Sequence, residues 1–381
     1  MRALKWIGIT IVALLAVATA AIVIGLYLTR PEPPPENSQS AAGLDEGPYS
    51  VGQAEFDWVD TTRPTPPNGD YAGSDERALP TVIWYPEDFE GSAPLVIYSH
   101  GFRSDREGGA YIAEYLASHG YVVASARFPL SNGSAPGGST INDVPSQPGD
   151  VSFLIDQMLS LSGDDKPFTA KLDADRIAAI GLSLGGLTTT LTTFHPEWRD
   201  PRIKAAVSMA GPADVFGPEF FDTSDAAYLV ISGTEDAIVP HRTNSAPIPG
   251  KLSSGGLLEI EGGTHAGFAD LMSGPVRLLG NPDELACSVV EFNTDGHPFD
   301  GMFGGPELGL VSPDEYVPAC SFELGDAISA GRQHMIAKLA IRALLESAFA
   351  ETEEGRRQSQ TYLTDTLPSD FPETRYLPAQ R

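Results

Sequence analysis

Short apolar runs alternate with amphipathic segments through the middle of the chain, and this alternation limits the fold more than any other feature. The apolar runs are rich in β-branched residues and predict buried strands, as in TVIWYP (81–86), PLVIYSH (94–100) and RIAAIGLS (176–183). The segment 148–161 places Val151, Leu154 and Met158 at helical spacing, which predicts a helix with one buried face. Repeated strand–helix units of this kind predict an α/β fold, a mainly parallel central sheet with helices on both faces.

A serine stands between glycines where one of these strands passes into a helix. Gly181-Leu182-Ser183-Leu184-Gly185 matches the pattern G-x-S-x-G, in which small residues flank a nucleophilic serine because the tight turn brings backbone segments close together. A glycine-rich helix start is the alternative interpretation. A serine hydroxyl needs a base before it can act as a nucleophile, so the interpretation depends on the loops that follow.

A carboxylate and a histidine follow two later predicted strands. Asp236 comes after the strand at 226–233, and His265 comes after the strand at 257–263. The order Ser, Asp, His is that of an α/β-hydrolase triad, and each residue lies just past the carboxyl end of a strand. Asp236 is the predicted acid. Asp214, after the preceding strand, is the alternative acid or a helix cap, and the neighbouring Glu235 is interpreted as a solvated loop charge.

Backbone donors for a developing oxyanion are expected beside this serine. The sequence SHGFRS follows the strand at 94–100, and the N–H groups of Phe102 and Leu184 are the predicted oxyanion hole. His100 is interpreted as a support for that turn. Zinc-ligand spacing, phosphate-binding loops and dinucleotide fingerprints are absent from the sequence, so neither a cofactor nor a metal is expected.

These motifs together resemble the α/β-hydrolase superfamily. The similarity covers about 81–268 and is carried by PLVIYSHGFRSDREGGAYIAEYLASHGYVVASARFP, GLSLGG, GTEDAIVP and GGTHAGF. Within the superfamily the chain resembles serine-type dienelactone-hydrolase-like, platelet-activating-factor acetylhydrolase-like and polyester-hydrolase-like proteins. Dienelactone hydrolases typically use a cysteine nucleophile, whereas this chain has Ser183.

The resemblance implies hydrolysis of carboxylic esters, small or lipid-like, through an acyl-enzyme on Ser183. The same machinery could attack an amide, a lactone or a thioester. Outside enzymes, the rival interpretation is a catalytically silent hydrolase fold that binds ligands in the cell envelope. The sequence leaves the natural substrate and the oligomeric state open.

The N-terminus predicts export. Residues 6–28 are uncharged and mostly apolar, long enough to cross a bilayer core of about 30 Å, and Arg2 and Lys5 precede them. We expect a signal-anchor at 1–30 with the catalytic region on the extracytoplasmic side. Cleavage after the small residues that end at Ala20 is the alternative and would give a secreted protein. A Pro-, Glu- and Ser-rich tether at 31–48 is expected to lead to a catalytic domain at 49–350.

The only two cysteines lie in an irregular, Gly- and Pro-rich insertion at about 266–325, before the last predicted helix. An exported compartment permits a Cys287–Cys320 disulfide, and closing that loop would contribute about 3 to 4 kcal/mol; two unrelated buried thiols are the alternative. The insertion is interpreted either as a lid over the pocket or as a stabilising insert. The acidic segment 351–381 is expected to be a partly disordered tail.

The overall charge excludes one large class of partners. The chain has 51 acidic and 24 basic residues, a formal charge of −27. Such a surface repels the phosphate backbone, so no nucleic-acid partner is expected.

Overall fold

A computed structural model gives the arrangement of these elements. It describes residues 30–381 apart from 164–165, 274–279, 290–296 and 314, and within 1–29 only 6, 12, 14–17, 19–20 and 24–27. Among the described residues, no helix combines the length and apolar character needed to cross a membrane. The predicted signal-anchor at 1–30 falls for the most part outside the described residues and stays a prediction.

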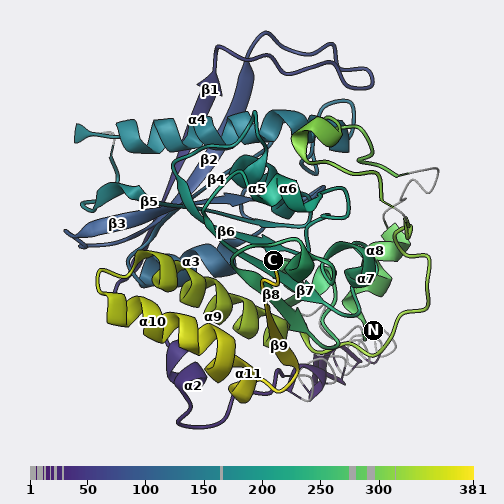
Figure 1. Cartoon of the computed structure of the whole chain (residues 1–381). Helices are drawn as coiled ribbons and strands as arrows, with labels where there is room; N and C mark the ends of the chain where they lie inside the picture. The colour runs from purple at the N-terminus through teal and green to yellow at the C-terminus, as the bar shows by residue number, and fades with distance from the viewer. Residues whose placement is uncertain are drawn as a thin grey trace.

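The described strands form one sheet of nine, in the order β1-β2-β4-β3-β5-β6-β7-β8-β9 (Figure 1). Strands β3 to β8 are joined by parallel pairings, whereas β1, β2 and β9 are antiparallel to their neighbours at the two edges. The mainly parallel α/β prediction is therefore confirmed. The strand bounds are β1 Val51–Asp60, β2 Arg77–Pro86, β3 Ser92–Ser99, β4 Val122–Ala126, β5 Lys171–Leu182, β6 Ile203–Met209, β7 Ala227–Gly233, β8 Gly256–Ile260 and β9 Thr374–Pro378.

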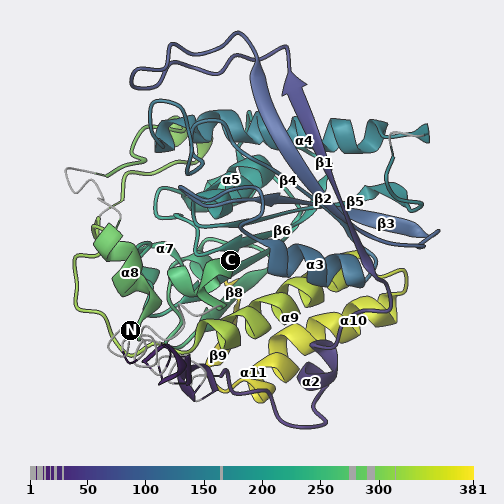
Figure 2. The same ribbon diagram turned by 180° about the vertical axis from the view of Figure 1, so that it is seen from behind.

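Helices cover both faces of the sheet, as Figures 1 and 2 show. One face packs on α4, α5 and α6, and the other packs on α3 and α9, with α10 lying against α9. Each face has its own apolar core because successive strand residues point to opposite sides. The helix bounds are α3 Ala110–Ser118, α4 Gln147–Ser160, α5 Leu184–Phe194, α6 Pro218–Phe221, α7 His241–Asn244, α9 Ala330–Phe349 and α10 Glu353–Thr361.

The insertion after β8 contains short helical segments and a disulfide. Helix α8, Pro282–Val289, carries Cys287, which is bonded to Cys320. The predicted disulfide is thus confirmed. The other elements in the described part of the insertion are 3₁₀ turns, η4 Ala266–Phe268, η5 Asp270–Ser273 and η7 Pro306–Leu308. In Figure 1 the insertion runs along the side of the molecule where α7 and α8 lie.

The expected tether at 31–48 and the expected tail at 351–381 both contain regular structure. Within the expected tether, α2 (Gln39–Gly43) packs beside the C-terminal segment, and the Ser40 hydroxyl lies 2.8 Å from the Tyr362 hydroxyl. The expected acidic tail instead contains α10, η8 (a π-helix, Tyr362–Thr366), α11 (Leu367–Asp370) and β9. The tail is ordered because its few apolar side chains are buried in the same core cluster as α9. These side chains are Tyr362, Leu363, Leu367 and Phe371.

Candidate active site

Ser183 occupies a strained corner between β5 and α5. Its backbone has φ 57° and ψ −120°, a left-handed conformation that non-glycine residues seldom adopt. Glycine is required on both sides of Ser183 because other backbone atoms lie too close to leave room for a side chain. A Cβ on Gly181 would lie 2.1 Å from the Gly185 carbonyl oxygen, and one on Gly185 would lie 1.9 Å from the Ser99 carbonyl oxygen. The G-x-S-x-G segment therefore forms a tight turn that presents the serine hydroxyl at the carboxyl edge of the sheet.

His265 connects this serine to a buried carboxylate. Its Nε2 lies 2.8 Å from Ser183 Oγ, and its Nδ1 lies 2.9 Å from Asp236 Oδ2. Asp236 follows β7 and its side chain is inaccessible to solvent, while its Oδ1 accepts N–H bonds from Ile238 and Val239. Since Asp236 only accepts, it holds Nδ1 as the protonated nitrogen and leaves Nε2 free to accept from the serine.

The charges around His265 shift its pKa upward. Burial alone would lower the pKa of His265, but the carboxylates of Asp236 and Asp283 outweigh it and raise that pKa above its ordinary value. The imidazolium that would form on proton transfer from Ser183 is therefore stabilised.

The two predicted oxyanion donors line the same cavity as Ser183. Among the described residues, the backbone N–H groups of Phe102 and Leu184 have no hydrogen-bond partner. His100 supports the turn before Phe102, because its Nδ1 bonds the Gly101 carbonyl at 2.8 Å and its Nε2 accepts from Phe128 N at 3.1 Å. Burial lowers the pKa of His100 to about 4, so it remains neutral.

Asp214, the alternative acid, pairs with a different histidine. Its Oδ2 lies 2.9 Å from Nε2 of His297, which comes from the insertion, and both side chains are more than nine-tenths buried. Tyr316 packs its ring edge-on against His297 with centroids 4.9 Å apart. Asp214 thus fastens the insertion to the cavity wall. The helix-cap interpretation is wrong, because the N-cap of the next helix, α6, is Gly217.

The other histidines and the phenylalanine cluster have partners away from Ser183. Phe216, Phe220 and Phe221 pack against one another in the core. The histidines bond or stack elsewhere: His119 with Tyr115, His195 with Phe303, His241 with Glu259 and His334 with Tyr111. The described residues contain no group of His, Cys, Asp and Glu side chains arranged to hold a metal.

A cavity of about 490 Å³ opens beside Ser183. Part of its wall comes from loops of the α/β core, including Phe102, Ile141 and Leu184. The insertion supplies the rest of the wall with His297, Pro298, Phe299, Tyr316, Val317 and Ala319. The insertion therefore contributes to the pocket wall, and its role as a lid or as a stabilising insert stays a prediction.

Sequence reasoning missed a second buried acid near His265. Asp283 in α8 is fully buried and accepts hydrogen bonds from the backbone N–H groups of Ala237, His265 and Ala266. No motif marks it, because it lies in the irregular insertion and its partners are backbone groups distant in sequence.

Comparison with known proteins shows the family of the chain. Over 272 residues the chain is 25% identical to cutinase est1 of Thermobifida alba. This match covers 67% of this chain and 82% of the cutinase. Over 305 residues it is 24% identical to cutinase cut1 of Thermobifida fusca, and this match covers 75% of this chain and 84% of the cutinase. The family described as PET hydrolase-like matches residues 78–273, more than half of the chain. The chain therefore belongs to the PET hydrolase-like family, α/β-hydrolases that cleave carboxylic esters with a serine nucleophile.

Proposed function

We propose that this protein hydrolyses carboxylic esters through an acyl-enzyme on Ser183, with His265 and Asp236 completing a catalytic triad. The observation that carries the proposal is the continuous hydrogen-bonded chain from Ser183 Oγ through His265 to Asp236 at 2.8 and 2.9 Å. The cavity beside Ser183 gives an ester access to this hydroxyl.

The geometry supports the following sequence of steps. His265 Nε2 takes the proton as Ser183 Oγ attacks the ester carbonyl, and the imidazolium is stabilised by Asp236. The N–H groups of Phe102 and Leu184 receive the developing oxyanion. His265 then returns the proton to the departing alkoxide, which leaves as the alcohol. Water attacks the acyl-enzyme by the same route and releases the acid.

Covalent trapping tests this proposal. We expect a fluorophosphonate probe to label the full chain once, at the peptide that contains Ser183, and to abolish turnover of p-nitrophenyl esters in proportion to labelling. Ser183→Ala should not label at all. Turnover that persists after stoichiometric labelling would contradict the proposal, and a folded protein that neither labels nor turns over would support the silent binding fold instead.

We propose that the insertion sets the acyl or alcohol preference. Tyr316 lines the cavity and packs on His297, so truncation of its ring enlarges the space available to a substrate chain. In Tyr316→Ala we expect the ratio of kcat/KM for long-chain over short-chain p-nitrophenyl esters to rise by about tenfold.

The matched control is Phe322→Ala, another aromatic residue of the insertion. Phe322 is 40% exposed and lies outside the cavity lining, so its truncation should leave the ratio unchanged. Equal chain-length profiles for Tyr316→Ala and the wild type would show that the insertion does not select substrates.

We propose further that the catalytic domain is exported and held at a membrane by the segment at 1–30. The apolar run at 6–28 and the disulfide support this location, because disulfides persist in oxidising compartments. Immunoblots of membrane and soluble fractions test it. An anchored protein stays with washed membranes at its full mass, whereas a cleaved one appears in the soluble fraction and is shorter.

A further inference from the structure

Asp283 joins the two loops that carry the acid and the base. Its Oδ2 accepts from Ala237 N at 2.9 Å, next to Asp236, and from His265 N at 3.1 Å. Its Oδ1 accepts from Ala266 N at 2.7 Å. One fully buried carboxylate thus contacts both loops through three backbone N–H groups.

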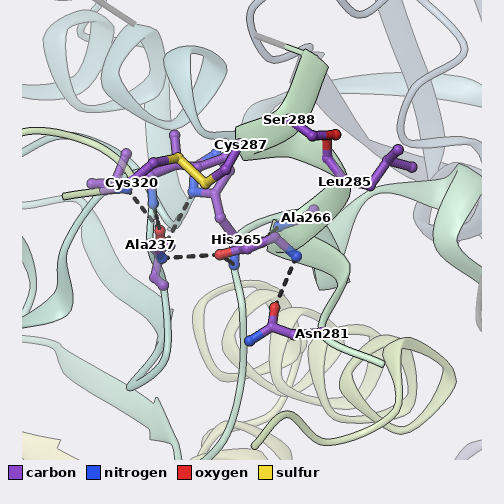
Figure 3. Close-up of a disulfide and its surroundings, with 12 residues drawn as sticks. Ala237, His265, Ala266, Asn281, Leu285, Cys287, Ser288 and Cys320 are labelled. Atoms are coloured by element: carbon purple, nitrogen blue, oxygen red, sulfur yellow. Dashed lines mark hydrogen bonds and ion pairs between the residues drawn. A yellow bond between two sulfur atoms is a disulfide. The ribbon is translucent and has the colours of Figure 1, made fainter. Parts of the chain in front are cut away.

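Ala237 is held from its other side as well. Its carbonyl oxygen accepts from Cys320 N at 2.6 Å, and Cys320 is bonded to Cys287 of α8, the helix that also contains Asp283. Figure 3 shows the disulfide beside Ala237, with His265 and Ala266 close by. A closed ring of contacts results. Asp283 of α8 bonds the Ala237 N–H group, the Ala237 carbonyl bonds Cys320, and the disulfide leads from Cys320 back to α8.

We propose that Asp283 is a positioning residue, which clamps the Asp236 loop to the His265 loop and holds the base in line with Ser183. The proposal rests on the function proposed above. Asp283 lies outside residues 78–273, the range that matches the family model.

The clamp also places a second carboxylate near His265. Burial and the nearby Asp236 raise the pKa of Asp283, while His265 and the N–H groups of Ala237 and Ala266 oppose that rise. Among the described residues, the charged side chains that act on the pKa of His265 are Asp236 after β7 and Asp283 in α8. The titratable side chain that α9 brings to the same segment is His334, which bonds the backbone of Gly267, Phe268 and Ala269. Burial lowers the pKa of His334 to about 4, so this histidine stays neutral. Loss of the Asp283 charge should therefore lower the pKa of His265, because Asp236 alone would then oppose the cost of burial.

Asp283→Asn tests the clamp with little change in volume. An amide has one acceptor and one donor side, so its NH₂ group must face at least one of the three N–H groups. We expect kcat to fall by about tenfold to a hundredfold with little change in KM, because small misplacements of a catalytic group are costly. We also expect the acidic limb of the kcat/KM profile to move to lower pH.

The matched control is Glu284→Gln, which removes a carboxylate from the next, exposed position of the same helix. It should leave kcat and the pH profile as in the wild type. An Asp283→Asn enzyme with wild-type kcat would overturn the proposal. A lower kcat with an unmoved acidic limb would also overturn it, since general loosening of the fold would produce that pattern.

If Asp283→Asn does not fold, the clamp can still be tested by measuring amide hydrogen exchange in the wild-type full chain. We expect slow exchange of the Ala237, His265 and Ala266 amides, and faster exchange at Ala237 after reduction of the disulfide, with strand β6 as the unchanged reference. Fast exchange of these amides in the oxidised protein would overturn the clamp. Because exchange does not depend on turnover, failure of the clamp is distinguishable from failure of the triad, which the Ser183 labelling tests.

Discussion

Asp236→Asn is expected to lower kcat for p-nitrophenyl esters by about ten-thousandfold while leaving the protein folded. The reason lies in the hydrogen bonds of this carboxylate. Oδ1 accepts from Ile238 N and Val239 N, so the amide oxygen of the substituted asparagine would take that place. Its NH₂ group would then face His265 Nδ1 and donate to it. This reverses the tautomer, so that Nε2 carries a proton and cannot accept one from Ser183.

Asp214→Asn is the matched control, because Asp214 is also a buried aspartate bonded to a histidine at 2.9 Å in the same cavity. Only the histidine bonded to Asp236 contacts Ser183, so Asp214→Asn should keep most of the turnover. Stopped assays over a pH range, with circular dichroism to verify folding, would measure both variants. If Asp214→Asn were the inactive one, the acid would be misassigned.

The residues of the candidate site could be predicted because each follows a local signal. Ser183 lies in a motif whose glycines are demanded by backbone contacts, and Asp236 and His265 directly follow strands that are recognisable from apolar runs. The carboxyl ends of parallel strands meet at one edge, so three residues distant in sequence were expected to converge.

The rest of the site could not be predicted because it depends on the path of the insertion. His297 and Tyr316 line the cavity, and Asp283 contacts Ala237, only because an irregular segment returns over the sheet edge. Nothing in the local sequence marks which backbone groups or side chains such a segment will meet. The meeting of Ser183, Asp236 and His265 was therefore predictable, whereas the residues of the pocket wall and the contacts of Asp283 were not.

The fold shows the same division. The strands of the parallel core were recognised, whereas β1 and β9 at the two edges were missed. In β1 apolar and acidic residues alternate and most side chains are partly or fully exposed, so the segment lacks a continuous apolar run. Strand β9 follows an acidic segment and is defined by its antiparallel pairing with β8, more than a hundred residues earlier.

A buried ion network is the other feature with no local signal. Arg77 in β2 is inaccessible to solvent and forms paired bonds to Asp150 in α4, both at 2.6 Å, and to Asp143, both at 3.0 Å. Burial opposes the Arg77 charge, but the two carboxylates outweigh it and raise its pKa. Asp143 belongs to η1 (Ile141–Ser146), the segment whose first residues line the cavity, so the network also anchors part of the pocket wall.

Arg77→Ala is expected to lower the free energy of unfolding by about 3 to 5 kcal/mol, because it leaves buried Asp143 without its cation and Asp150 with only Arg63, at 2.8 Å. Arg77→Lys should lose less, since an ammonium keeps the charge but cannot form both paired contacts. Urea unfolding followed by circular dichroism would measure the free energy of unfolding of the two variants.

Arg357→Ala is the control. Arg357 and its partner Glu354 are both solvent-exposed, so the unfolding midpoint of this variant should match that of the wild type. A loss below about 1 kcal/mol in Arg77→Ala would mean that the two carboxylates become protonated or hydrated without cost to the fold.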